Sequence, residues 1–442
     1  MKKTLLLIFI VWNVSSAKGR QIKTPVTLAD TNRAMPPALQ SPPFPSGDYT
    51  GSPIIGEPDG TPDYPLQKLL FGNRLDKSHL KLYGWINPSI NYSTTKLSNV
   101  PISYNIIPNR PVLDQLVLRF ERPLNTAQTD HFDFGFRITG LYGVDYRFTT
   151  AKGWFSNQLI RSNNLYGFDP VEAYGLLYFP HFGEGFVIKF GRYISPPDIE
   201  AQLAPDNYMY SHSIMFTYDP FTFTGIQSTL RLSKYWQVEL GLTAGNDMAP
   251  WSNSASPTGE AVVRYVSPSN DDSFLGGIDM IGKAEFNHNH DDLSMVSGTW
   301  GHRFNKTFHM MTEAYYEWQY NAELGGSAIF GPVRYGTGGG AGPIIPGRSD
   351  AVGAVNYFQI LCSSSSFFSI RNDFLWDQQG QRTGFKTTYS SHTIGFNHYF
   401  NALIVIRPEI RYGRDYANGV NAYDAGKKNS QFTAATDIIV RF

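Results

Sequence analysis

The chain has 442 residues, with 37 Lys and Arg against 37 Asp and Glu, so its formal net charge is zero. This balance argues against a nucleic-acid-binding protein, which normally carries an excess of basic residues. Charged residues make up 17% of the chain and aromatic residues 15%, and the charged share is below the roughly 25% of ordinary soluble domains. The single cysteine, Cys362, excludes an internal disulfide framework. A mean hydropathy of −0.28 excludes a bundle of membrane helices.

Residues 1–17 have the pattern of a bacterial secretory signal peptide. Two lysines precede an apolar run at residues 5–12, and a small-residue cleavage site ends at Ala17. An uncleaved anchor is the weaker alternative, because the apolar run is far shorter than the ~20 residues that span a bilayer. No other apolar run approaches that length, so a membrane location requires a β-barrel. We therefore expect an exported protein of the bacterial outer membrane.

Residues 18–77 are rich in proline and show no sustained periodicity. We interpret them as an extended or disordered N-terminal arm. A plug or a partner-binding segment is the alternative for this arm. Residues 78–442 form the remaining unit.

From Leu80 onward, apolar and polar residues alternate with a period of two. Between Phe132 and Phe148 the even positions are almost all aromatic or aliphatic, whereas the odd positions include Asp133 and Arg137. Such strands suit either a soluble sandwich, which buries the apolar face, or a membrane barrel, which turns that face to lipid. The alternating segments are ~10–16 residues long, against a mode of ~5–6 in globular sheets. Aromatic residues gather near strand ends, and the chain ends on Phe442 within an alternating strand, as in the assembly signal of outer-membrane proteins. These features favour the barrel.

Short and long connections also alternate, and this allows the strands to be counted. We predict sixteen strands, at residues 80–93, 112–122, 131–148, 170–179, 185–194, 222–233, 235–245, 259–268, 273–286, 293–304, 307–320, 351–361, 367–377, 384–399, 402–414 and 431–442. The segment Tyr210–Asp219 alternates too, and eighteen strands is the alternative if it pairs with a further strand. Treating 195–221 as one long connection keeps the total even, as expected for a bacterial barrel. This connection is then the third outer loop, which we expect to fold inward and to hold a short helix after Pro197.

Several motifs resemble one family of outer-membrane proteins. They are Gly191–Asn207, Tyr83–Pro88, Asp247–Trp251, Gly298–Phe304 and Met311–Tyr316. The chain resembles the putative β-barrel porin-2, OmpL-like family over residues 78–442. The resemblance implies an outer-membrane barrel and supplies no substrate and no catalytic residues.

Many charged residues fall on the inward side of the predicted strands. They are Lys81, Arg119, Glu121, Asp133, Arg137, Asp145, Arg147, Lys189, Arg231, Glu239, Arg264, Asp279, Arg303, Glu313, Glu317, Arg371, Asp373, Arg407, Glu409, Arg411, Asp437 and Arg441. Because Lys or Arg facing lipid costs ~2–4 kcal/mol at the midplane, these charges require a wet or hydrogen-bonded interior. Arg192 shares the side of Phe190, so we expect it on the apolar face.

Acids on an inward loop opposite arginines on the wall would form a pore constriction with a transverse field. The candidate acids are Asp198, Glu200 and Asp206. The candidate arginines are Arg119, Arg137 and Arg147. The alternative is that the acids cap a surface helix or bind cations at lipid headgroups.

Metal and catalytic motifs are weak in this sequence. The segment Asn287–Asp292 holds two histidines and two aspartates, but lacks the fixed spacing of metal motifs and suits a hydrophilic outer loop. Ser211 and Ser213 flank His212, and Ser391 precedes His392. Neighbouring residues on a strand point to opposite faces, so these pairs do not predict a catalytic dyad. We expect no enzymatic activity, no metal and no cofactor.

The sequence thus predicts a porin for passive diffusion of small hydrophilic solutes or ions, with weak selectivity. The alternative is a closed or narrow barrel with an adhesion, envelope-structural or partner-binding role. The expected partners are the lipid bilayer, the solutes, the outer-membrane assembly machinery and, by analogy with other sixteen-stranded porins, two further copies in a homotrimer.

Overall fold

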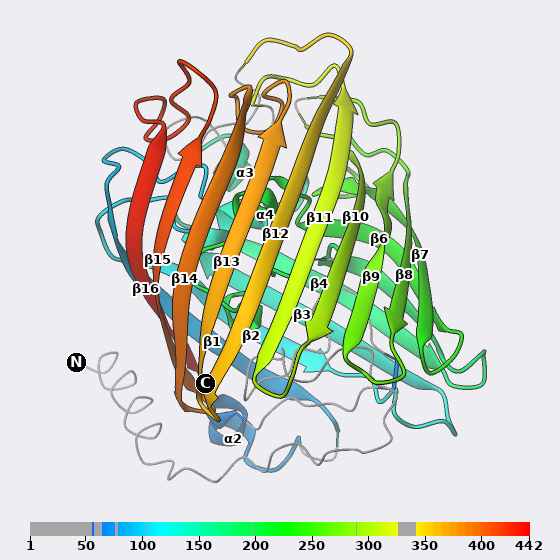
Figure 1. The fold of residues 1–442 in the computed structure, drawn as a ribbon. Helices are drawn as coiled ribbons and strands as arrows, with labels where there is room; N and C mark the ends of the chain where they lie inside the picture. The colour runs from blue at the N-terminus through cyan, green and yellow to red at the C-terminus, as the bar shows by residue number, and fades with distance from the viewer. Residues whose placement is uncertain are drawn as a thin grey trace.

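The computed structural model describes residues 55–56, 64–75, 78–102, 104–196, 198–288, 290–325 and 342–442. The predicted signal peptide and most of the predicted arm lie outside the described residues. Sixteen strands close into one antiparallel barrel in which each strand pairs with its neighbours in sequence and β1 pairs with β16 (Figure 1). This confirms the predicted number of strands, and the eighteen-strand alternative is wrong.

The strands follow the predicted bounds closely. They are β1 (Lys81–Ser93), β2 (Val112–Arg122), β3 (Asp133–Gly143), β4 (Gly167–Phe179), β5 (Phe186–Ile194), β6 (Thr222–Arg231), β7 (Trp236–Asn246), β8 (Thr258–Val266), β9 (Asp272–Ile281), β10 (Ser294–Arg303), β11 (Phe308–Tyr320), β12 (Arg348–Ser363), β13 (Ser366–Asp377), β14 (Thr387–Asn401), β15 (Ile404–Asp415) and β16 (Ser430–Arg441). The described helical segments are short: α2 (Pro65–Phe71), η2 (Val144–Phe148), α3 (Asn157–Ile160), η3 (Ala204–Asp206) and α4 (Ile214–Tyr218). In the described part of the chain, no helix has the length and apolar character needed to cross a membrane.

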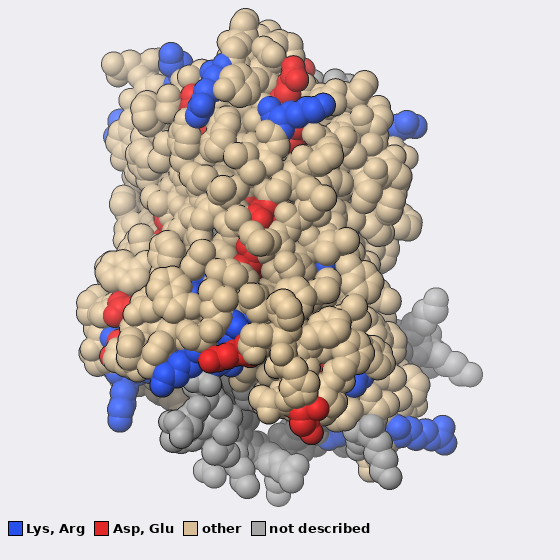
Figure 2. All heavy atoms as spheres, turned by 90° about the vertical axis from the view of Figure 1, so that its right-hand side faces the viewer, with Lys and Arg blue, Asp and Glu red and all other residues tan. Residues whose placement is uncertain are grey.

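The alternation of the strands decides between a soluble sandwich and a membrane barrel. On β7, Leu240 and Leu242 are 60% and 61% exposed, whereas Glu239 between Val238 and Leu240 is 1% exposed. The apolar face is therefore outside and the charged face inside, the reverse of a soluble protein. Figure 2 shows Lys and Arg gathered toward the two ends of the barrel wall, with a largely uncharged band between them. This band is the surface that faces lipid.

The two ends of the barrel differ in the length of their connections. Short turns such as residues 232–235, 304–307 and 402–403 lie at the end where the C-terminus is found (Figure 1). Long connections, including residues 94–111 and 195–221, lie at the opposite end. This asymmetry is typical of outer-membrane barrels, in which the short turns face the periplasm.

Two local predictions on the wall are wrong. The predicted strand 131–148 ends at Gly143, whose φ of 155° lies in a region that L side chains rarely adopt. A Cβ at this position would lie 1.9 Å from the carbonyl oxygen of Asp114, so only glycine fits here. Beyond it the chain continues as η2. Arg192 is fully buried and does not face lipid, because Gly191 at φ 126° interrupts the alternation and the guanidinium pairs with Asp169 at 2.8 Å.

The arm is not wholly extended, since its described part contains α2. Gln67 Oε1 of α2 accepts a hydrogen bond from the backbone N–H of Leu82 at 2.8 Å. Tyr64 stacks on Tyr83 of β1 with ring centroids 4.5 Å apart. On the other side of the barrel, the backbone N–H of Ile55 donates to Gln237 Oε1 at 3.0 Å. The described pieces of the arm thus contact inward-facing residues near the short-turn end.

The two ends of the barrel chain meet at the seam between β1 and β16. The backbone N–H of Phe442 donates to the oxygen of Gly84 at 2.9 Å, and the N–H of Gly84 donates back to the oxygen of Phe442 at 3.0 Å. The terminal residue therefore takes part in closing the barrel. Its role as an assembly signal stays a prediction.

Candidate functional site: the loop inside the barrel

The connection between β5 and β6, residues 195–221, is the inner loop. Its described residues are buried except Asp206, which is partly exposed. Ser211 N donates to Glu409 of β15 at 3.0 Å, and the hydroxyl of Tyr210 lies 2.6 Å from that of Ser89 on β1. Ile199 N donates to Glu313 of β11 at 2.6 Å. The inner loop therefore contacts inward side chains of strands far apart around the wall.

The local structure of the inner loop differs from what the alternation of Tyr210–Asp219 suggested and from the predicted position of its short helix. The alternating segment Tyr210–Asp219 contains α4, in which Ser213 acts as the N-cap: its hydroxyl accepts a hydrogen bond from the N–H of Phe216 at 3.0 Å. The short helix predicted after Pro197 lies further along, as η3. Alternation fails here because the segment is enclosed on all sides by other parts of the chain, so neither face has to be apolar or polar.

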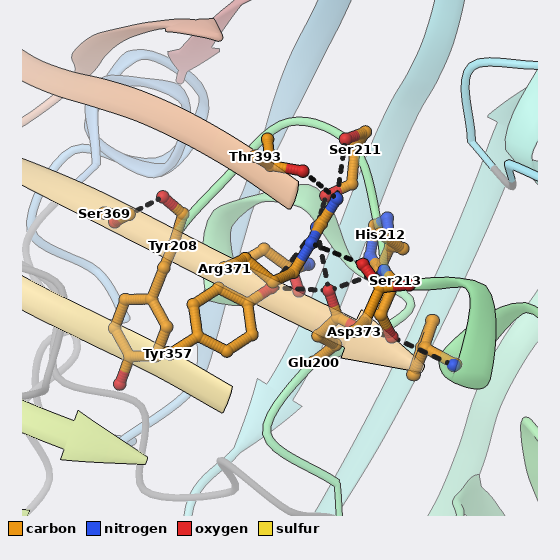
Figure 3. A network of polar contacts seen from close by, with 12 residues as sticks. Glu200, Tyr208, Ser211, His212, Ser213, Tyr357, Ser369, Arg371, Asp373 and Thr393 are labelled. Atoms are coloured by element: carbon orange, nitrogen blue, oxygen red, sulfur yellow. Dashed lines mark hydrogen bonds and ion pairs between the residues drawn. The ribbon is translucent and has the colours of Figure 1, made fainter. Parts of the chain in front are cut away.

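Glu200 and Arg371 form the centre of one polar network (Figure 3). Arg371 Nη1 of β13 lies 3.1 Å from Glu200 Oε1, and both side chains are buried. The backbone N–H of Ser213 donates to both oxygens of Glu200 at 2.9 and 3.0 Å, and the hydroxyl of Tyr357 donates to Oε1. Arg371 also donates to the hydroxyl of Thr393 at 3.1 Å. The charge of Glu200 is thus compensated by Arg371, not by the arginines that the sequence suggested.

A second contact holds the middle of the inner loop. Arg407 of β15 donates to the carbonyl oxygens of Ala204 and Asn207 at 2.8 and 2.9 Å. The same guanidinium pairs with Asp437 of β16, and Asp437 in turn accepts from Asn87 of β1 at 2.8 Å. The inner loop is therefore fixed to the wall near the barrel seam as well.

Asp206 is the candidate acid that lies among the predicted arginines. It interacts electrostatically with Arg119 and Arg137, and also with Arg441. Both predicted arginines have closer partners on the wall: Arg119 lies 2.8 Å from Glu172, and Arg137 lies 2.7 Å from Glu121.

Arg147 belongs to η2 and donates to Asn163 Oδ1 and to the backbone oxygen of Asn164, both at 2.8 Å. The prediction that it lies on a strand is wrong, since β3 ends before it.

Asp198, the third candidate acid, has acids as its neighbours. One oxygen each of Asp198, Asp219 and Glu313 lie within 4.8 Å of one another. Alternation placed Glu313 on the inward face, but the three acids are remote in sequence, and only the path of the inner loop brings them together.

The wall on the opposite side, formed by β6, β8 and β9, carries inward polar groups with no hydrogen bond to the described residues of the inner loop. These groups include the amide of Gln227, the hydroxyl of Thr229 and the carboxylates of Glu260 and Asp279. Gln227 interacts with Glu260, and Asp279 interacts with Ser297 of β10. All four residues are at most 4% exposed, so they are enclosed and only partly hydrogen-bonded.

The histidine motifs have structural partners. His212 Nε2 lies 2.9 Å from the carbonyl oxygen of Ala201, and its ring stacks on Tyr104 with centroids 3.9 Å apart. His290 Nε2 lies 3.1 Å from the carbonyl oxygen of Asp247. Asp291, beside it, pairs with Arg382 at 2.7 Å. These side chains therefore connect segments that are distant in sequence.

A closed barrel with an apolar outer surface, a charged interior and a loop that enters this interior is the architecture of an outer-membrane porin. A family model described as "Putative beta-barrel porin-2, OmpL-like" matches residues 79–442, so the chain belongs to this family. The protein is an outer-membrane β-barrel of the porin type. A comparison with curated protein sequences gives no significant match.

Solved porin structures are similar in fold. An anion-selective porin from Comamonas acidovorans has a TM-score of 0.53 at 9% sequence identity, over 82% of this chain and 99% of that one. OprB from Pseudomonas putida, in its high-pH structure, has a TM-score of 0.51 at 9% identity, over 85% of this chain and 97% of that one. At this identity the likeness shows the fold, whereas the solute depends on side chains.

Proposed function

We propose that the protein is a passive diffusion channel for small hydrophilic solutes and ions, and that these pass between the inner loop and the wall of β6, β8 and β9. The observation that carries this proposal is a closed sixteen-strand barrel with a charged inner face, in a chain that belongs to a porin family. Arg371 on one side of the wall donates to Ser211 of the inner loop, whereas Gln227 and Thr229 on the other side have no hydrogen bond to the described residues of the loop. The proposed path therefore runs along the second side.

Weak selectivity is the expected property of this path. Glu260 and Asp279 are the acids nearest to it, whereas Glu200 is already paired with Arg371. Of the acids predicted to produce a transverse field, Asp206 is therefore the one that lies near the predicted basic residues Arg119 and Arg137. Both signs are present along the interior, so we expect a mild preference for cations that depends on Glu260 and Asp279.

Planar-bilayer recording of the purified full-length protein tests the proposal. We expect stepwise currents, and a reversal potential in a salt gradient that moves toward zero in the double variant Glu260→Gln/Asp279→Asn. No stepwise current from correctly folded protein would refute the pore. Liposome swelling with sugars, amino acids and salts would then define the solutes that pass.

A closed or narrow barrel is the second candidate, and the described pieces of the arm favour it. Ile55 and Tyr64 are buried, and the carbonyl oxygen of Ile55 accepts from Arg231 at 3.1 Å. These contacts lie at the short-turn end of the barrel and would narrow its opening there. Silent bilayers with an intact fold would support this candidate. The homotrimer and recognition by the assembly machinery stay predictions, which cross-linking in intact membranes would test.

A further inference from the structure

Three buried carboxylates meet where the inner loop contacts β11. Asp198 and Asp219 come from the two ends of the inner loop, and Glu313 comes from the strand. One oxygen of each lies within 4.8 Å of the others. The residues are 3%, 1% and 3% exposed, so bulk water does not screen their mutual repulsion.

Basic side chains do not compensate this cluster. In the described part of the chain, ion pairs neutralise Glu200 and Asp291, but none involves Asp198, Asp219 or Glu313. Two hydrogen bonds reach the cluster from other described residues: Ile199 N donates to Glu313 at 2.6 Å, and the hydroxyl of Ser195 donates to Asp198 at 3.4 Å. Within the cluster, the carboxyls of Asp198 and Asp219 lie within hydrogen-bonding distance of each other.

Asp219 provides a second and independent observation. Neither of its oxygens has a hydrogen-bonding partner among the described residues other than the carboxyl of Asp198, although the side chain is almost completely buried. Asp279 of β9 has no ion pair among the described residues, interacts with the hydroxyl of Ser297, and interacts electrostatically with Asp198 and Glu313. Burying an uncompensated carboxylate costs several kcal/mol, so an arrangement of this kind requires a cation or bound protons.

We propose that Asp198, Asp219 and Glu313 bind a divalent cation, and that this cation is Ca²⁺. The ligand atoms are carboxylate oxygens without imidazole or thiolate, which suits a hard cation. Mg²⁺ gives up its water reluctantly and is usually bound by only one or two carboxylates, so a buried site of three carboxylates suits Ca²⁺ better, with backbone carbonyls and water completing the six to eight ligands that Ca²⁺ takes.

The proposed ion has a mechanical consequence for the barrel. Asp198 lies near the start of the inner loop, Asp219 lies near its end, and Glu313 belongs to the wall. One ion would therefore tie both ends of the loop to β11. This inference does not depend on solute passage, since a closed barrel would use the same site.

Calorimetric titration of the full-length protein with Ca²⁺ tests the site, after refolding in detergent without lipid and removal of divalent ions by a chelator. We expect one Ca²⁺ per chain, weaker binding of Mg²⁺, and a rise in the unfolding temperature on addition of Ca²⁺. Asp219→Asn should weaken binding by at least about tenfold. Asp271→Asn, which removes an acid from a short turn outside the cluster, should bind as the wild type does.

Asp219→Asn also separates a binding role from a structural one. Without Ca²⁺ this variant should unfold at a higher temperature than the wild type, because it relieves repulsion between buried carboxylates. With Ca²⁺ the difference should shrink or reverse. The proposal is overturned if folded wild-type protein binds no Ca²⁺ at millimolar concentration, or if Asp219→Asn binds Ca²⁺ as tightly as the wild type does.

Discussion

Replacing Arg371 with methionine should loosen the inner loop without destroying the barrel. Arg371 lies on β13 and is the basic partner of Glu200 at 3.1 Å. Its guanidinium also donates to Ser211 and to Thr393. Methionine keeps most of the side-chain volume, so the substitution removes the charge and the hydrogen bonds rather than the packing. The strand pairing of β13 uses backbone groups and is unaffected.

The size of the effect follows from the burial of the pair. The side chains of Arg371 and Glu200 are 0% and 4% exposed, so removing the arginine leaves an uncompensated buried carboxylate. Such a change costs about 3–5 kcal/mol. Glu200 keeps its hydrogen bonds from Ser213 and Tyr357, so we take the lower end, about 3 kcal/mol. A difference of about 3 kcal/mol raises the population of the displaced loop by about two orders of magnitude.

Single-channel recording should detect the displaced loop. We expect Arg371→Met to show frequent transitions to a larger conductance and faster liposome swelling with a given sugar. The double variant Glu200→Gln/Arg371→Met should recover much of the wild-type behaviour, because it leaves no charge at position 200, while Asp373, which Arg371 contacts at 3.6 Å, keeps Arg411 at 3.8 Å.

The control is Arg122→Met, which removes a wall ion pair with Asp133 at 2.7 Å and has no bond to the described residues of the inner loop. It should leave the conductance unchanged. If folded Arg371→Met had the same conductance levels and the same switching frequency as the wild type, the inner loop would not be held by this pair and the reasoning would be wrong.

Two further predictions concern the outer loops and the chain terminus. Burial opposes ionisation of Asp424, but hydrogen bonds from the backbone N–H groups of Leu97 and Lys96 outweigh it and lower its pKa. This contact between two outer loops therefore stabilises the fold above about pH 4, the ordinary range of aspartate, and is lost as the pH falls and the carboxyl is protonated. Asp424→Asn should lower stability by about 1 kcal/mol at pH 7 and by little at pH 3, measured by thermal unfolding; an equal effect at both pH values would contradict it. Phe442→Ala should reduce the amount of folded barrel in the outer membrane but not refolding in detergent, because the backbone bonds of Phe442 to Gly84 are kept. Equal yields in membranes would argue against a role in assembly.

The amino-acid sequence determined the barrel because each strand carries its own signal. Alternation over a dozen residues shows which face of a strand is apolar, and the lengths of the connections show which end of the barrel faces the periplasm. Both signals are local, so they needed no knowledge of contacts between distant residues. For the same reason the inward positions of Arg371, Glu313 and Asp279 were predictable, since each follows from the parity of its own strand.

Only the tertiary structure determines which of those side chains pair with the inner loop. Glu200 faces Arg371 rather than Arg119, although nothing in the local pattern distinguishes these two arginines. Where a residue departs from the regular strand backbone, as at Gly143 and Gly191, the alternation of inward and outward side chains no longer predicts the positions of the residues that follow. Pairings across the interior depend on the path of an enclosed segment without a repeating pattern, and only the closed barrel determines that path.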